Sequence, residues 1–289
     1  MKIKVYTLNA FAKIEEGGNP AGVVLDADSL SDETMQKIAQ KVGFSETAFV
    51  QKSDKADFKV RFFTPNGEVD LCGHATIATF YLMAKKNLLK SGTYTQETKA
   101  GILNLEVQND NTIFMNQNSP QFFDEIKKKE IAESLNISEE IISDDLPVQI
   151  VSTGLRDIFI PIKSLEDLHN IKPNFEEVSK VSKKYDVIGY HLFTLETKYD
   201  STAHCRNLAP LYDIPEEAGT GTSSGALSCY LFKYGKISKQ DVNHLIFEQG
   251  YSMKKPSEIF VNLKLQDDKI VEVKVGGIAS NIQEKELTI

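Results

Sequence analysis

Cysteine and histidine are scarce in this chain, which argues against stabilisation by disulfide bonds or by a bound metal ion. The three cysteines, Cys72, Cys205 and Cys229, are too few and too far apart for a disulfide framework or a paired-cysteine metal site. This usage fits a reducing compartment. The five histidines have no metal-binding spacing, so we expect no metal.

Long apolar runs and concentrated positive charge are also missing. No segment is apolar for long enough to span a bilayer, and the opening residues MKIKVYTLNAF lack the apolar core and cleavage site of a signal peptide. We therefore expect a cytoplasmic protein with no membrane partner. The net charge is −8, and its lysines and arginines are scattered among acidic residues, so nucleic acid is not an expected partner.

The composition is that of a globular protein, and the length suits one large domain or two of ordinary size. Hydrophobic residues make up 41% of the 289 positions and charged residues 26%. Helix-like and strand-like segments are mixed, and strands often follow one another directly, which indicates an α+β fold. No low-complexity linker divides the chain, and we place the domain boundary near residue 118, within NQNSPQ.

Two segments predict helices that are buried on every side. Residues 72–87 and 219–236 begin with glycine and small or polar residues, continue almost wholly apolar, and end in lysines. An amphipathic helix is predicted before them, over 31–42, with Ser31 as its N-cap and Gly43 at its end. Each half of the chain is thus predicted to wrap strands around one buried helix.

A buried helix that begins at a glycine presents backbone N–H groups and the positive end of its dipole. Two such ends facing each other would bind a carboxylate or stabilise a developing enolate. The residues expected to line this pocket are Gly73, His74 and Ala75 on one side, and Gly221, Thr222 and Ser223 on the other.

The stretch GFSETAFVQ, residues 43–51, places Glu46 among small and apolar neighbours. In a strand Glu46 would share one face with Phe44, Ala48 and Val50, and a partly desolvated carboxylate there can take and return a proton. A surface glutamate at a strand start is the alternative. Glu217, or equally Glu216, supplies an acidic residue near the second glycine-rich helix start. A titratable group near each helix start favours the functional interpretation.

Six segments, taken in order, resemble successive signatures of the PhzF-like family, named for a phenazine-biosynthesis isomerase. They are LNAF, GGNPAGVVL, FSETAFV, RFFTPNGEVDLCGHATIA, EEAGTGTSSGA and FEQGYSMKKPSEI. The resemblance implies the fold of diaminopimelate epimerase, in which two pseudo-symmetric α+β domains each roll a mixed β-sheet into a barrel around a central α-helix. With the boundary near residue 118, we assign residues 1–117 with 275–289 to the first domain and 118–274 to the second, and the resemblance implies a homodimer.

The resemblance further implies a cofactor-independent isomerase that acts on a small carboxylate-bearing substrate in the cleft between the domains. It makes Glu46 the acid/base, lets His74 assist or bind substrate, and places Glu217 in the site. Substrate binding is expected from Asn19, Gly73, Ala75, Gly221, Thr222 and Ser223. The family commonly has DPxTGS where this chain has EAGTGT. Loss of the proline leaves this turn less restrained.

Two other functions compete with the isomerase. An amino-acid epimerase or racemase on this fold needs a cysteine at each helix start, but Ala218 occupies the position that matches Cys72, and Cys205 and Cys229 fall outside the motif. One thiol cannot deprotonate one face of a substrate and reprotonate the other. The other competitor is a catalytically idle member that binds a metabolite or a protein partner.

Overall fold

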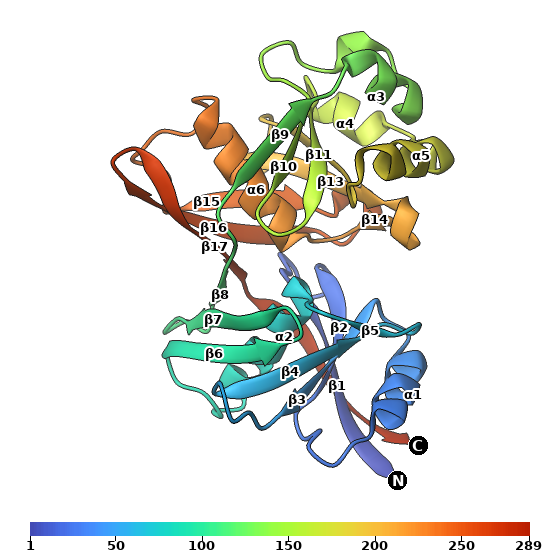
Figure 1. Cartoon of the computed structure of the whole chain (residues 1–289), viewed down its shortest axis with the longest axis vertical. Coiled ribbons are helices and arrows are strands. Elements are labelled where there is room, and N and C mark those ends of the chain that lie inside the picture. The colour runs from blue at the N-terminus through green and yellow to red at the C-terminus, as the bar shows by residue number, and fades with distance from the viewer. The chain divides into compact units, whose positions relative to one another are not determined.

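The computed structural model describes all 289 residues, which form two compact units. Unit 1 comprises Met1–Asn116 and Gly276–Ile289, and unit 2 comprises Gln117–Val275. The colours of Figure 1 show the same division, because unit 1 contains the blue and teal elements together with the last red strand. The chain therefore enters unit 2 once and returns once.

Unit 1 is a mixed β-sheet with two helices. Its strands are β1 (Lys2–Ala10), β2 (Asn19–Val24), β3 (Glu46–Gln51), β4 (Phe58–Phe63), β5 (Glu68–Val69), β6 (Gly92–Thr98), β7 (Gly101–Val107), β8 (Ile113–Asn116) and β18 (Ala279–Thr288). The pairing order is β18, β1, β2, β3, β4, β6, β7, β8, with β5 added to β4. The pairs β2–β3 and β4–β6 are parallel, and the others are antiparallel.

The helices of unit 1 are α1 (Asp32–Val42) and α2 (Gly73–Lys85). Ser31 caps α1 by accepting from the Thr34 N–H at 3.2 Å, and Gly43 ends it, so the prediction for 31–42 is confirmed. Helix α2 is buried from His74 to Ala84 and contacts β1, β2, β3, β7, β8 and β18. It is therefore the central helix of this unit, as its all-round apolar sequence predicted.

Unit 2 repeats this plan and adds a helical layer. Its strands are β9 (Gln121–Glu125), β10 (Gln149–Ser152), β11 (Arg156–Pro161), β12 (Gly189–Thr194), β13 (Ala203–Ala209), β14 (Ile214–Glu217), β15 (Leu245–Gln249), β16 (Ser257–Gln266) and β17 (Lys269–Gly277). The order β9, β10, β11, β12, β13, β15, β16 has parallel pairs at β11–β12 and β13–β15. Strand β14 pairs with β13.

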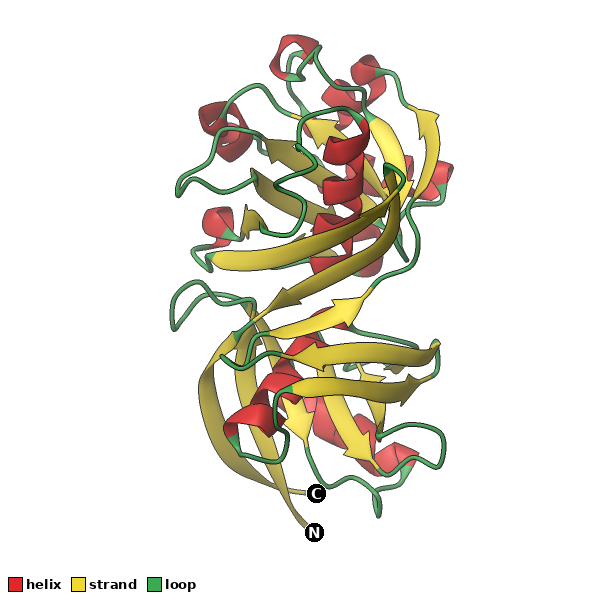
Figure 2. Ribbon diagram, turned by 90° about the vertical axis from the view of Figure 1, so that its left-hand side faces the viewer, coloured by secondary structure: helices red, strands yellow, loops and turns green.

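The central helix of unit 2 is α6 (Gly221–Lys233), which contacts β10 and β16. The added layer contains α3 (Lys128–Leu135), α4 (Leu165–Asn170) and α5 (Phe175–Tyr185), and both α4 and α5 pack on β12. Figure 2 shows one long helix among the strands of each unit. The predicted α+β class is therefore confirmed. None of the helices combines the length and apolar character needed to cross a bilayer.

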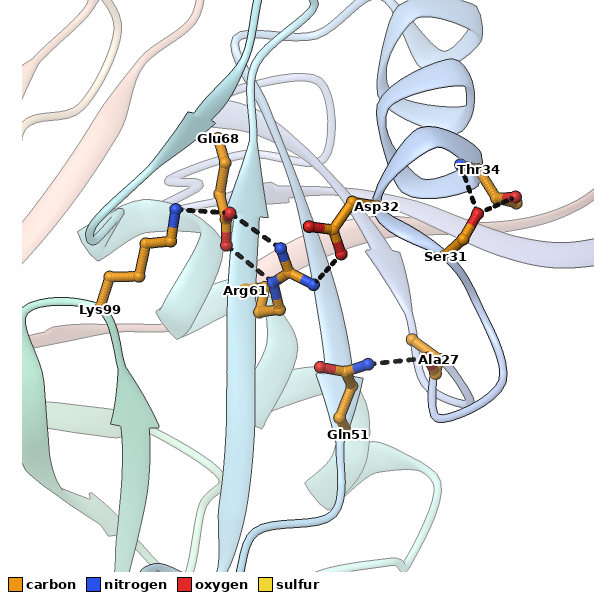
Figure 3. A network of polar contacts seen from close by, with 8 residues as sticks. All are labelled: Ala27, Ser31, Asp32, Thr34, Gln51, Arg61, Glu68 and Lys99. Atoms are coloured by element: carbon orange, nitrogen blue, oxygen red, sulfur yellow. Dashed lines mark hydrogen bonds and ion pairs between the residues drawn. The ribbon is translucent and has the colours of Figure 1, made fainter.

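An ion-pair network in unit 1 fixes the segment that leads into α2 (Figure 3). Arg61 on β4 donates from Nε and Nη2 to the two carboxylate oxygens of Glu68 on β5, at 2.7 and 2.8 Å. Its Nη1 donates to Asp32 at 2.6 Å, and Lys99 pairs with Glu68 at 2.6 Å. These cations lower the pKa of Glu68, and the bidentate geometry holds β5 on β4. The chain therefore reaches Cys72 and α2 from an anchored strand.

Candidate active site

Glu46 is the first residue of β3 and is only 15% exposed in its side chain. It pairs with Ala21 of the parallel neighbour β2. The predicted face is only partly right, because β3 begins at Glu46 and Phe44 precedes it. Ala48 and Val50 are buried, but so are the residues on the opposite face, since the strand lies between the central helix α2 and α1.

The Glu46 carboxylate meets His74, the second residue of α2. Glu46 Oε2 lies 3.3 Å from His74 Nε2, and the His74 side chain is 6% exposed. The ring also lies 3.5 Å from Ser45 Oγ and 3.4 Å, through Nδ1, from Cys72 Sγ. Two residues 28 positions apart in the sequence are thus brought into direct contact by the packing of β3 against α2.

The N-terminus of α2 surrounds this pair with backbone donors. The first hydrogen bond within the helix runs from the Thr76 N–H to the Cys72 carbonyl oxygen at 3.0 Å. The N–H groups of Gly73, His74 and Ala75 therefore precede the first acceptor that the helix provides, and the dipole is positive there. Asn19 is buried at the start of β2, two residues before the Ala21 that pairs with Glu46.

In unit 2, the two neighbouring glutamates of β14 have different surroundings. Glu216 forms a bidentate ion pair with Arg206, at 2.9 Å for both contacts, and Arg206 also donates to the carbonyl oxygens of Leu168 and Ile171. Glu217 instead accepts a 2.5 Å hydrogen bond from Thr220 Oγ1. The geometry commits Glu216 to a structural ion pair and leaves Glu217 beside the start of α6.

The turn from Glu217 to Thr220 is held by Gln249, which closes β15. Gln249 Nε2 donates to the Glu217 carbonyl oxygen at 2.8 Å and to Thr220 Oγ1 at 3.0 Å, while Gln249 Oε1 accepts from the Thr220 N–H at 3.2 Å. The segment that lacks the proline is therefore not free of restraint. Hydrogen bonds from a distant strand hold the segment that the proline would have stiffened.

The first turn of α6 places Thr222 at the partly exposed rim and Ser223 in the interior. Ser223 Oγ donates to Asp157 Oδ2 at 2.5 Å and accepts from Asn207 Nδ2 at 3.3 Å. Burial raises the pKa of Asp157 to about 6, and the charge of Glu217 adds to this increase, although the bond from Ser223 opposes it. The Ser223 side chain is therefore engaged inside the unit by Asp157 and Asn207.

Sequence analysis missed Asp157, Asn207, His191 and Gln249. Asn207 Nδ2 also bonds His191 Nδ1 at 3.1 Å, and burial lowers the pKa of His191 to about 3. One signal was present, since Asp157 is a lone acid in the apolar stretch RDIFIP. Nothing local to Asn207 or Gln249 indicates that their side chains reach the start of α6.

The two remaining cysteines are both fully buried. Cys205 lies in β13 and Cys229 within α6, and burial raises the pKa of both thiols, that of Cys229 to about 12. Neither thiol can act as an exposed base beside the start of α6, where Ala218 stands. The structure therefore does not favour the two-thiol epimerase.

Comparisons with known proteins agree over nearly the whole chain. The family described as phenazine biosynthesis-like protein, PhzC-PhzF, matches residues 8–285. An uncharacterized isomerase of Clostridium acetobutylicum is 37% identical, with 100% of this chain and 99% of the relative covered. The trans-2,3-dihydro-3-hydroxyanthranilate isomerase of Pseudomonas chlororaphis is 27% identical, with 93% and 94% covered.

Solved structures give the same result. The Bacillus anthracis phenazine biosynthesis protein of the PhzF family superposes with a TM-score of 0.89 at 36% identity and 100% coverage of both chains. A hydroxyproline epimerase from Agrobacterium vitis, 10% identical with 99% of this chain and 92% of that chain covered, has a TM-score of 0.62 and therefore shares the fold alone. Since the family match and the isomerase relatives span almost every residue, this chain belongs to the PhzF family and is an isomerase.

Proposed function

We propose that the protein is a cofactor-independent isomerase in which Glu46 moves a proton between two positions of one small carboxylate-bearing substrate. The observation that carries this proposal is the contact of Glu46 with His74 at the N-terminus of α2. A largely buried carboxylate beside an imidazole and a positive helix end is suited to acid/base catalysis.

In the proposed step the Glu46 carboxylate takes a proton from a carbon atom of the substrate. The C–H bond breaks, and its electron pair moves into the conjugated system of the substrate, which becomes an enolate-like anion. The N–H groups of Gly73, His74 and Ala75 stabilise this negative charge. Glu46 then returns the proton to a different atom, so that substrate and product are isomers and no oxidant or reductant is consumed.

His74 is proposed to orient Glu46 and to bind the substrate. Its ring is enclosed by Glu46, Ser45 and Cys72, which limits its rotation. A fixed ring keeps the carboxylate oxygen aimed in one direction, which lowers the reorganisation needed in the transition state. Asn19, at the start of the neighbouring strand β2, is proposed to add a polar contact to the substrate.

The test measures isomerisation and solvent-deuterium uptake in deuterated water. The wild type, Glu46→Gln and the control Glu16→Gln, an exposed site of the same chemistry, are incubated with small carboxylates. Trans-2,3-dihydro-3-hydroxyanthranilate is the first compound, because one relative is named for its isomerisation. Turnover should be lost in Glu46→Gln by at least about 100-fold, as expected for loss of a general base, and retained in Glu16→Gln. Equal turnover in all three proteins would exclude Glu46 as the base.

A further inference from the structure

Three different metal-ligand groups meet where β3 and α2 begin. The carboxylate of Glu46, the thiol of Cys72 and the ring of His74 each offer one ligand atom, and these atoms all lie within 4.8 Å of one another. Cys72 and His74 are buried, and Glu46 is partly exposed. The sequence pattern did not reveal this set, because its members stand at positions 46, 72 and 74 without a known metal-binding spacing.

The separations of these atoms match those of a tetrahedral zinc site. Zinc binds sulfur at about 2.3 Å and nitrogen or oxygen at about 2.0–2.2 Å, so tetrahedral angles place N and O ligands about 3.4 Å apart and S and N ligands about 3.6 Å apart. Here Glu46 Oε2 and His74 Nε2 are 3.3 Å apart, and Cys72 Sγ and His74 Nε2 are 3.9 Å apart. These two separations are within a few tenths of an ångström of the tetrahedral values, and the third, from Glu46 to Cys72 Sγ, is no longer than 4.8 Å.

The ligand types select among metals. A thiolate with an imidazole and one carboxylate suits zinc, whereas magnesium and calcium require oxygen ligands in larger number. Glu46 Oε2 is buried and makes no hydrogen bond, so no donor competes with a metal ion for this oxygen. The nearby Ser45 hydroxyl, 3.5 Å from His74 Nε2, offers a polar neighbour to a metal-bound ligand.

We propose that Glu46, Cys72 and His74 bind one Zn²⁺ ion, with a fourth position for water or an anionic ligand. Zinc bound to Glu46 Oε2 withdraws electron density from the carboxylate and competes with the proton, so Glu46 becomes too weak a base for the proton transfer of the isomerase reaction. Zinc therefore inhibits the enzyme by occupying its base. The inhibition rests on the proposed function, but the binding of the metal does not.

The binding test uses Co²⁺, which takes the same tetrahedral sites as zinc and absorbs visible light. The full chain, freed of metal by a chelator, is titrated with Co²⁺ as wild type, Cys72→Ala and Cys229→Ala. The wild type and Cys229→Ala should develop a thiolate-to-cobalt charge-transfer band and intense visible bands that saturate at about one equivalent, as one site of three protein ligands requires. Cys72→Ala should lack the charge-transfer band, and added Zn²⁺ should remove the bands from the wild type.

Glu46→Gln provides a second variant that keeps the size of the side chain. It should weaken Co²⁺ binding at least about 10-fold, since even indirect ligand contacts contribute that much. Absence of the charge-transfer band in the wild type, or its persistence in Cys72→Ala, overturns the metal site. Turnover by the metal-free wild type is measured separately, so a failed isomerase and a failed metal site are distinguishable.

Discussion

Gln249 Nε2 donates a hydrogen bond of 2.8 Å to the backbone carbonyl oxygen of Glu217, and this bond links strand β15 to the residue that precedes the turn into α6. The same side chain also holds Thr220 through its Oγ1 and its N–H. Gln249 is fully buried, so no water can replace these bonds. Gln249 therefore fixes the backbone on both sides of that turn, and we propose that it positions the Glu217 carboxylate, which the family resemblance places in the site.

We expect Gln249→Ala to destabilise the protein and to reduce activity. Unpaired buried polar groups at Glu217 and Thr220 should lower the free energy of unfolding by about 1–3 kcal/mol. Activity of the folded fraction should fall mainly in kcat, since Glu217 would be mispositioned and not removed. Urea unfolding and steady-state kinetics measure the two effects. The exposed Gln283→Ala serves as the control, and unchanged kinetics in Gln249→Ala would show that the turn is held by other contacts.

The role of Gln249 illustrates which parts of the site the sequence could predict. Central helices, the Ser31 cap and the α+β class follow from local patterns, since hydrophobic periodicity and capping depend on near neighbours. The turn at 217–220 appears unrestrained from its own residues, because the restraint comes from a side chain about 30 positions away. The sequence predicted that Glu46 and His74 belong to one site, but not that they are in contact. The distance of 3.3 Å between Glu46 Oε2 and His74 Nε2 results from tertiary packing.

The choice between Glu216 and Glu217, which the sequence left open, can be tested with a matched pair. Glu216→Gln removes the counterion of the buried Arg206 guanidinium, so it should lower the free energy of unfolding by about 3–5 kcal/mol while the folded fraction keeps its activity. Glu217→Gln should have the opposite profile, with little loss of stability and a clear loss of activity. Denaturation and kinetics on both variants decide the assignment. Activity that depends on Glu216 alone would reverse it.

Gly250 permits a close approach to the segment that contains Ala218. Its φ is +82°, and a Cβ placed there would lie 2.3 Å from the Lys255 carbonyl oxygen and 2.6 Å from that of Ala218. Gly235 has a similar φ of +69° but nothing within 4 Å. Gly235→Ala should therefore lower the free energy of unfolding by only about 1–2 kcal/mol, which is the energy needed to hold alanine in the left-handed conformation.

Gly250→Ala adds a steric clash with two carbonyl groups to the same conformational cost. Gly250→Ala should lower the thermal unfolding temperature clearly more than Gly235→Ala does. Displacement of the Ala218 segment should reduce activity as well. Differential scanning calorimetry compares the two proteins. Similar losses in both would mean that the Ala218 segment moves aside at little cost.

Asp157 should make the stability of the protein depend on pH in a direction unusual for a carboxylate. Its pKa is raised to about 6 by burial, so the folded state binds this proton more tightly than the unfolded chain does. The contribution of Asp157 to stability is therefore full below about pH 4 and is lost as the pH rises through 6. The shift corresponds to about 3 kcal/mol.

His191 acts in the opposite direction and conceals this effect in the wild type. Its pKa is lowered to about 3 by burial, so its contribution to stability is lost as the pH falls below 6.5. The difference between wild type and Asp157→Asn isolates the aspartate, because His191 and Glu217 remain in both proteins. Asparagine keeps an oxygen that can accept from the Ser223 hydroxyl.

Free energies of unfolding from urea titrations between pH 4 and 7 provide the measurement. Relative to the wild type, Asp157→Asn should gain stability as the pH rises, by up to about 3 kcal/mol over this range. A constant difference between the two proteins at every pH would show that Asp157 has the same proton affinity in the folded and unfolded states. A difference that grows with pH means that Ser223, at the start of α6, is bonded at neutral pH to a buried carboxylate whose charge destabilises the fold.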